Sequence, residues 1–253
     1  MGTGDIFRAL ADLCFPRECL VCGRALGMRE RHLCAHCMAG LPLTHYWESG
    51  HNPLSDAFNA RIQEGISAYE PYSYAVSLFY YRPENGFRNI TRSLKYRGNL
   101  SSGRFFAAML GDRLAGTDHF KDVDYVIPVP LHWTRKWRRG YNQAEIIARE
   151  IAGRLGAECL PWALRRNRAT RTQTRMTIAE KQANVSGAFG VRKRALPRIA
   201  EARHVLLTDD VFTTGATLYA CYRALRSCFP GLRISLAALG SVPVSNGVRR
   251  LSR

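Results

Sequence analysis

The chain has 253 residues, of which 46% are hydrophobic and 23% are charged, a composition that supports one large globular domain plus a small module. Its longest apolar stretch near the C-terminus, residues 234–244, contains a glycine and a proline and is too short to span a bilayer. Three of the first 13 residues are charged, so they lack the apolar core of a signal peptide. We therefore expect a cytoplasmic protein without a transmembrane segment.

The net charge is strongly positive and unevenly distributed. The chain carries 37 Lys/Arg against 20 Asp/Glu, which gives +17, and residues 131–203 alone carry 17 basic against five acidic residues. Such a balance favours polyanionic partners. A solvated surface that only resists aggregation is the alternative. Charge by itself does not distinguish a nucleic acid from a phosphorylated small molecule or an acidic protein.

Two C-x-x-C pairs mark the N-terminal segment. Cys19 and Cys22 form the first pair, and Cys34 and Cys37 form the second after eleven intervening residues. Four thiolates can enclose Zn²⁺ tetrahedrally and stabilise a module with little core of its own. The separation is shorter than the usual ~15–20 residues. Disulfides are the main alternative, but nothing marks the chain as secreted. We predict a double zinc-ribbon or zinc-finger-like module over residues 1–45, with a structural metal.

The central part of the sequence separates a connector from a main domain. Residues 46–70 show no long periodicity and are interpreted as a connector, and residues 71–245 are interpreted as one domain. That domain begins with a strand over residues 71–82. Two helices follow over residues 83–96 and 100–114, split at Gly98 and Asn99. Lys95 ends the first of these helices, either as a C-terminal cap or as a ligand contact.

An apolar strand over residues 125–130 leads into a basic loop over residues 131–143 and a helix over residues 144–155. A strand end, a basic loop and a helix start together predict an anion site. Trp133 and Trp137 lie among the charges of this loop. They could stack on the bases of a single strand, at about 1–3 kcal/mol per base. Alternatively, they could pack under the stems of neighbouring arginines.

The most informative stretch is the strand run that ends in Asp209 and Asp210, followed by a Thr/Gly-rich turn and a helix over residues 218–228. In an open α/β sheet such a turn lies where ligands bind, and the amides of the helix N-terminus favour phosphate. Thr213, Thr214 and Thr217 add hydroxyl donors. The two carboxylates can accept bonds from sugar hydroxyls or hold hydrated Mg²⁺. The alternative is an ordinary strand-to-helix turn with Asp caps.

This run resembles the phosphoribosyl pyrophosphate (PRPP) motif of type I phosphoribosyltransferases. The resemblance implies that Asp209 and Asp210 bind the ribose hydroxyls and that the turn binds the 5′-phosphate, with Mg²⁺ accompanying PRPP. Thr208 departs from the usual apolar residue, and Thr213 stands where purine-base members commonly carry a carboxylate. Purine salvage is therefore disfavoured. The implied phosphoribosyl-binding residues are Asp209, Asp210, Val211, Thr213, Thr214, Gly215, Ala216 and Thr217.

Other positions acquire roles from the same resemblance. The loop after the first core strand receives pyrophosphate in these enzymes, which implies that role for Arg135, Lys136, Arg138 and Arg139. Residues 165–189 have the composition of a mobile lid that brings positive charge over a bound anion. With Asp209 and Asp210, Arg171 and Arg175 of this lid complete the expected catalytic set by stabilising the departing pyrophosphate.

Over nearly its whole length the chain resembles the ComF/GntX family. The likeness rests on the cysteine pairs, Leu-Lys-Tyr-Arg-Gly at 94–98, Pro-Val-Pro at 128–130, Arg-Gly-Tyr-Asn-Gln at 139–143 and the PRPP-like motif. Lys181 departs from an arginine of the family. Membership implies an α/β fold with a mainly parallel sheet and flanking helices, and a role in cytoplasmic handling of single-stranded DNA during natural transformation, with the competence helicase machinery as a partner.

The reaction is not fixed by these patterns. We expect a phosphoribosyltransferase whose acceptor is unknown. A non-catalytic nucleic-acid binding protein on the same fold is the second hypothesis, and single-strand affinity that falls steeply with salt would identify it. A GntX-like metal or iron–sulfur assembly factor is the third, for which the bound metal would be labile or an iron–sulfur cluster.

Overall fold

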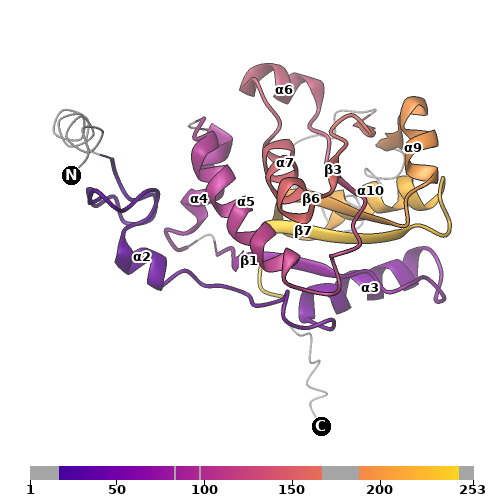
Figure 1. Ribbon diagram of the computed structural model, residues 1–253, viewed down its shortest axis with the longest axis horizontal. Helices are drawn as coiled ribbons and strands as arrows, with labels where there is room; N and C mark the ends of the chain where they lie inside the picture. Colours follow the sequence, from indigo (N-terminus) through magenta and orange to yellow (C-terminus); the bar gives the residue numbers. More distant parts are fainter. Residues whose placement is uncertain (1–16, 83, 97, 167–187, 245–253) are drawn as a thin grey trace, which may run out of the picture.

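A five-stranded, entirely parallel sheet forms the centre of the protein (Figure 1). The computed structural model describes residues 17–82, 84–96, 98–166 and 188–244. In spatial order the strands are β1 (Ala75–Tyr80), β7 (Arg233–Ser241), β6 (His204–Phe212), β2 (Tyr125–Pro128) and β3 (Glu158–Cys159). All four neighbouring pairs run parallel. The predicted fold class, a mainly parallel sheet with flanking helices, is confirmed.

Helices cover both faces of the sheet. The neighbours α5 (Leu100–Ala115) and α7 (Gln143–Leu155) pack side by side on one face and run in the same direction, since Asp112 near the end of α5 pairs with Arg154 near the end of α7. On the other face, Phe58 of α3 (Pro53–Gly65) contacts the rings of Tyr219 and Tyr222 of α10 (Ala216–Arg226), at centroid distances of 6.3 and 5.8 Å. Right-handed crossovers from β2 to β3 and from β6 to β7 run in opposite directions, which places α7 and α10 on opposite faces.

Shorter elements surround this frame. The N-terminal module contains α2 (Ala35–Ala39) and lies at one end of the molecule (Figure 1). The others are α4 (Arg88–Tyr96), α6 (Trp133–Arg139), the antiparallel pair β4 (Leu164–Arg166) and β5 (Phe189–Val191), η1 (Lys193–Ala195) and α9 (Leu196–Ala200). None of the helices in the described part of the chain combines the length and apolar character that a membrane crossing requires.

The interpretation of residues 46–70 as a connector without regular structure was wrong, because α3 lies there. Asn52 caps this helix by accepting hydrogen bonds from the amides of Leu54 and Ser55, and Pro53 occupies its first turn. Leu54, Phe58 and Ile62, spaced by four residues, are buried. The Asn-Pro pair reads as a loop when it is taken alone. Together with this spacing it is the start of an amphipathic helix.

A second correction concerns residues 131–143, where the predicted basic loop contains the short helix α6. This segment has no buried apolar stripe, so hydrophobic periodicity gave no indication of a helix. The neighbouring predictions were closer: α4 begins at Arg88, α5 and α7 match the expected ranges within one residue, and α10 begins two residues before the predicted start.

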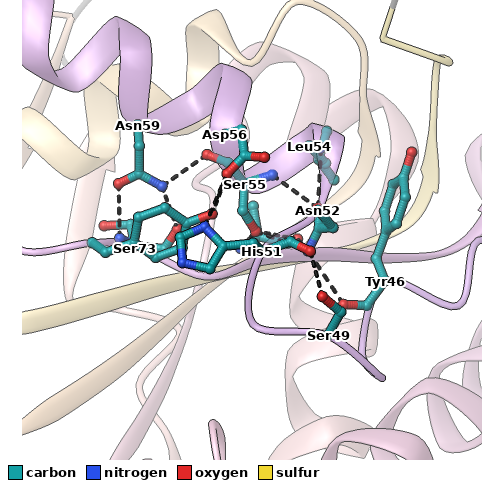
Figure 2. A network of polar contacts seen from close by, with 11 residues as sticks. Tyr46, Ser49, His51, Asn52, Leu54, Ser55, Asp56, Asn59 and Ser73 are labelled. Atoms are coloured by element: carbon teal, nitrogen blue, oxygen red, sulfur yellow. Dashed lines mark hydrogen bonds and ion pairs between the residues drawn. The ribbon is translucent and has the colours of Figure 1, made fainter.

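Polar side chains of α3 satisfy the free edge of β1 (Figure 2). Asn59 accepts a bond from the amide of Ser73 through Oδ1 and donates one to the carbonyl of Ser73 through Nδ2, both at 2.8 Å. Ser55 Oγ accepts from the amide of Ala75 at 2.8 Å. Because a sheet edge leaves amides and carbonyls unpaired, these buried bonds replace a missing strand. They fix α3 against the sheet.

Asn59→Ala removes these bonds and leaves the buried Ser73 amide and carbonyl without partners. We expect it to lower the free energy of unfolding by about 2–3 kcal/mol, because unsatisfied buried polar groups retain their desolvation cost. Urea denaturation measures the change. Gln63→Ala, at an exposed position of the same helix, is the control and should stay within about 0.5 kcal/mol of the wild type. Equal effects of the two variants would contradict the proposed role of the network.

Candidate functional site

Two adjacent carboxylates lie at the end of the central strand β6. Asp210 is 8% exposed, and its Oδ2 lies 2.7 Å from Nζ of Lys95 in α4. The Asp210 amide donates a hydrogen bond to Oδ1 of Asp209 at 2.8 Å. Lys95 therefore reaches the carboxylate pair. Sequence reasoning left helix capping and ligand contact as equal alternatives for Lys95, and the structure shows its ammonium group at the site.

The electrostatics of the pair are unusual for aspartates. Burial, and then the negative charge of Asp210, raise the pKa of Asp209 to about 7. Lys95 and Arg166 of β4 act in the opposite direction on Asp209. Burial alone would lower the pKa of Lys95, but the charge and hydrogen bond of Asp210 outweigh it, so the pKa of Lys95 is raised. Near neutral pH the pair can accept hydrogen bonds from hydroxyl groups or exchange a proton.

The turn after β6 carries exposed threonine side chains and leads into the N-terminus of α10. Thr213 and Thr214 are exposed, and Gly215 has a φ of +67° as the N-cap of α10. A Cβ at Gly215 would lie 2.5 Å from Cζ of Phe212, so both conformation and space require glycine here. The amide of Ala216 donates to Oγ1 of Thr214 at 3.4 Å, whereas Gly215 offers no side-chain acceptor to the other first-turn amides of α10, among them that of Thr217. Helix N-terminal amides in this state accept anions.

A residue that the sequence did not indicate supports this turn. Arg61 of α3 donates from Nη1 to the carbonyl of Thr214 at 2.9 Å, and its guanidinium lies 4.6 Å from the ring centroid of Tyr219. The two partners are 153 residues apart in the sequence. No local pattern relates them, and only the packing of α3 on α10 brings them together.

The 94–98 and 139–143 motifs meet beside the carboxylates. The Tyr141 hydroxyl donates to the carbonyl of Leu94, which ties the segment before α7 to α4. Asn142 donates from Nδ2 to the carbonyl of Val129 at 2.9 Å, and its Oδ1 accepts from the amide of Ala144 as the cap of α7. These bonds hold the end of β2, the end of α4 and the start of α7 in one arrangement.

Residues of the predicted pyrophosphate site lie on α6, next to the end of α4. Arg139 places its guanidinium 5.3 Å from the ring centroid of Tyr96. Arg139 Nε and Gln143 Nε2 are buried and lack a hydrogen-bond partner in the part of the chain that the structure describes. Arg138 is exposed on α6. The side chains of Arg135 and Lys136 lie outside the description, as do Arg171 and Arg175 with the rest of residues 167–187.

Exposed aromatic side chains lie on the same side of the site. Trp133 and Trp137 of α6 are 72% and 87% exposed, and Tyr96 of α4 is 68% exposed. The two tryptophans are one helical turn apart, which places them on one face of α6. Because they are so exposed, the alternative that they pack under arginine stems is wrong. We call Tyr96, Trp133, Trp137, Arg138 and Arg139 the aromatic–basic surface.

The four predicted cysteine ligands converge in the N-terminal module. The Sγ atoms of Cys19, Cys22, Cys34 and Cys37 all lie within 4.8 Å of one another. Backbone amides of Cys22 and Cys34 stabilise the Cys19 thiolate against the cost of burial and lower its pKa to about 6. These four thiols can hold a metal ion. The ring of His32 packs against Phe105 of α5 in a tilted arrangement, at 5.3 Å between centroids, and so attaches the module to the sheet domain.

The fold and the polar cluster together define the class: an α/β protein with a parallel sheet and a group of polar side chains at the carboxyl ends of β2 and β6. The DNA utilization protein YhgH of Escherichia coli O157:H7 is 30% identical to the chain over 203 residues, which are 79% of this chain and 80% of that protein. Competence protein F of Haemophilus influenzae is 37% identical over 112 residues, 44% of this chain and 47% of that one. The chain belongs to the ComF/GntX family.

Other comparisons add less. No family model matches the chain. Adenine phosphoribosyl transferase from Trypanosoma brucei aligns with a TM-score of 0.36 and 15% identity, over 81% of this chain and 87% of that structure. A similarity this low adds nothing to the parallel sheet that is seen directly.

Asp209→Asn should stabilise the fold at pH 8. The native state holds the Asp209 proton up to a pKa of about 7, whereas the unfolded chain releases it near 3.8, so stability falls as the pH rises between these values. We expect the variant's free energy of unfolding to exceed that of the wild type by about 1–2 kcal/mol at pH 8, a gain common at strained polar sites, and by much less at pH 4. Urea denaturation at both pH values measures it. A gain independent of pH would contradict the assignment.

Proposed function

We propose that the protein binds PRPP, or a related phosphoribosyl ligand, together with Mg²⁺, and that it handles single-stranded DNA in the cytoplasm during natural transformation. The observation that carries the first part is the pair of the half-buried Asp209 and the buried Asp210, directly before the turn that leads into the N-terminus of α10. Family membership supports the second part, since relatives carry the names competence protein and DNA utilization protein.

Each group of a phosphoribosyl ligand has a counterpart in this arrangement. The amides and hydroxyls of residues 213–217 would bind the 5′-phosphate, and Val211 and Ala216 would border the sugar. The ribose hydroxyls would donate to Asp209 and Asp210. The ammonium of Lys95 lies 2.7 Å from Asp210 and offsets the negative charge of that carboxylate. The pair can then accept two hydrogen bonds from a diol without carrying two unbalanced charges.

The pyrophosphate of PRPP would lie toward α6. Arg138, Arg139, Arg135 and Lys136 would bind it, and the unpartnered Nε of Arg139 and Nε2 of Gln143 supply buried donors for its oxygens. Bound Mg²⁺ would neutralise pyrophosphate charge. In a transfer reaction, an acceptor would attack C1′ while the bond from C1′ to pyrophosphate breaks. Arg171 and Arg175 would then stabilise the charge of the leaving group. The PRPP-binding domain would span residues 71–245.

Asp209→Asn/Asp210→Asn should lower PRPP affinity at least about 100-fold, because two charge-assisted hydrogen bonds to the ribose are lost. Calorimetric titration with PRPP, with and without Mg²⁺, measures the effect. Asp112→Asn/Asp118→Asn removes the same charge from exposed positions and should leave the affinity unchanged. Unchanged PRPP affinity in the Asp209/Asp210 variant, or no binding of PRPP by the wild type, would contradict the proposed ligand site.

For the cysteine module we propose one structural Zn²⁺. With Zn–S bonds of about 2.3 Å, the sulfurs of a tetrahedral site lie about 3.8 Å apart, and Cys22 Sγ lies 3.8 Å from Cys34 Sγ. The four cysteine sulfurs would occupy all four coordination positions of the zinc, which leaves no open position for chemistry. Metal analysis separates this proposal from the assembly-factor alternative: one firmly held zinc per chain supports it, whereas labile metal or iron with inorganic sulfide favours the alternative.

The aromatic–basic surface favours binding of single-stranded DNA. It equally supports the second candidate function, a non-catalytic protein that binds nucleic acid. Exposed aromatic rings beside arginines are the combination that binds single strands, since bases stack on the rings and cations contact the phosphates. In soluble proteins two tryptophans this exposed on one helix face mark an interaction site. If the competence helicase machinery is a partner, this surface would receive the strand that it delivers.

Trp133→Ala/Trp137→Ala should weaken binding of a single-stranded oligonucleotide about 10- to 100-fold or more, at about 1–3 kcal/mol for each stacked base. Fluorescence anisotropy at several salt concentrations measures it. The dependence of affinity on salt should stay the same, because no phosphate contact is removed. Tyr69→Ala removes a 96%-exposed aromatic ring elsewhere and is the control. Equal affinities of the two variants would contradict a stacking role for α6.

A further inference from the structure

A cavity of about 790 Å³ lies between α3 and α10, away from the carboxylate pair and the aromatic–basic surface. The C-terminal half of α3 forms one wall, α10 and the residues after it form another, and Phe189 of β5 borders it. This volume falls in the range of small-molecule sites, about 300–1,000 Å³. Nothing in the proposed phosphoribosyl site uses these residues apart from Arg61.

The cavity has an excess of positive charge. Arg61 is half-buried, its pKa is lowered by burial, and it forms no ion pair with any residue that the structure describes. The exposed side chain of Arg223 forms neither a hydrogen bond nor an ion pair within the same described residues. Arg226 is neutralised by Glu70, at 2.8 Å. Glu64 is the remaining acidic residue of the lining and is exposed. Glu64 interacts with Arg61 electrostatically without forming an ion pair, so the three arginines of the lining still outnumber its two carboxylates. This balance favours an anion, and guanidinium groups match phosphate oxygens best.

Most of the remaining lining residues are apolar. Ile66, Phe189, Ala220 and Ala224 offer aliphatic and aromatic surface next to the arginines. Inorganic phosphate alone would leave most of this surface and most of the volume unused. A ligand that fits both halves has a planar or apolar body and a phosphate group. Nucleoside phosphates have this chemistry and this size.

The cavity is connected to the turn after β6 through one side chain. Arg61 lines the cavity and also donates to the carbonyl of Thr214 at 2.9 Å. Its guanidinium is held over Tyr219, another residue of the lining. A phosphate bound to Arg61 would therefore change the position or the charge balance of the group that supports residues 213–217.

We infer that the cavity between α3 and α10 is a second ligand site, which binds a nucleoside phosphate through Arg61 and Arg223 and is coupled through Arg61 to the turn at residues 213–217. The location of the site is independent of the proposed function, whereas the coupling rests on it. Because coupling between two sites is reciprocal, a ligand in the cavity changes PRPP affinity by the same factor by which PRPP changes the affinity of the cavity for its ligand.

The first experiment is calorimetric titration of the full chain carrying Asp209→Asn/Asp210→Asn with ADP, so that the carboxylate pair does not contribute. One ADP should bind per chain. Adding Arg223→Ala should weaken it at least about tenfold, through loss of a charge-assisted contact. Arg104→Ala, at an exposed position of α5 on the opposite face of the sheet, is the matched control and should have no effect. Absence of ADP binding, or equal effects of the two arginine variants, would overturn the site.

The second experiment tests the coupling in the wild-type protein. PRPP affinity should change at least about threefold when ADP is saturating, and Arg61→Met should remove that change. Unchanged PRPP affinity in the presence of bound ADP overturns the coupling. The outcomes also separate the two proposals. If the wild-type protein binds ADP but not PRPP, the phosphoribosyl site alone is refuted. If it binds PRPP but not ADP, the cavity site alone is refuted.

Discussion

The contact on which the candidate site depends is the ion pair between Lys95 and Asp210. Two neighbouring carboxylates at the end of a buried strand repel each other and lose solvation, which is why the pKa of Asp209 is raised to about 7. The Lys95 ammonium, 2.7 Å from Asp210, offsets part of that cost. The hydrogen bond from Tyr141 to the carbonyl of Leu94 helps to hold the end of α4, and with it Lys95, beside β6. The 94–98 and 139–143 motifs thus have a shared physical task.

Helix α3 connects stability to the sites. Its N-terminal half satisfies the free edge of β1 through Ser55 and Asn59, and its C-terminal half carries Arg61 to the turn after β6. A helix needed to complete the sheet is also a rigid platform for a side chain that supports a ligand turn. Arg61 in turn lies between the carboxylate site and the cavity along α10, so the two proposed sites share one supporting residue.

Part of the positive charge of the chain is concentrated on α6. Arg138 and Arg139 lie on α6 with two exposed tryptophans, next to Tyr96 and close to the carboxylate pair. Long-range attraction by the net charge of +17 would bring polyanions to the molecule from any direction. Stacking on the exposed rings is short-ranged and would decide where a single strand stays. This arrangement places a proposed DNA surface beside a proposed phosphoribosyl site.

The sequence by itself indicated the cysteine cluster and the position of the Asp209 and Asp210 turn, because each depends on a local pattern: C-x-x-C spacing and a strand that ends in acidic residues. Its resemblance to the ComF/GntX family added the parallel α/β class. The sequence did not determine α3, whose start reads as a loop until Leu54, Phe58 and Ile62 are seen to be buried. Nor did it indicate Arg61, or decide between a cap and a ligand contact for Lys95. Only the tertiary structure decided these points, because their partners Thr214 and Asp210 lie more than a hundred residues away in the chain, and packing alone brings them together.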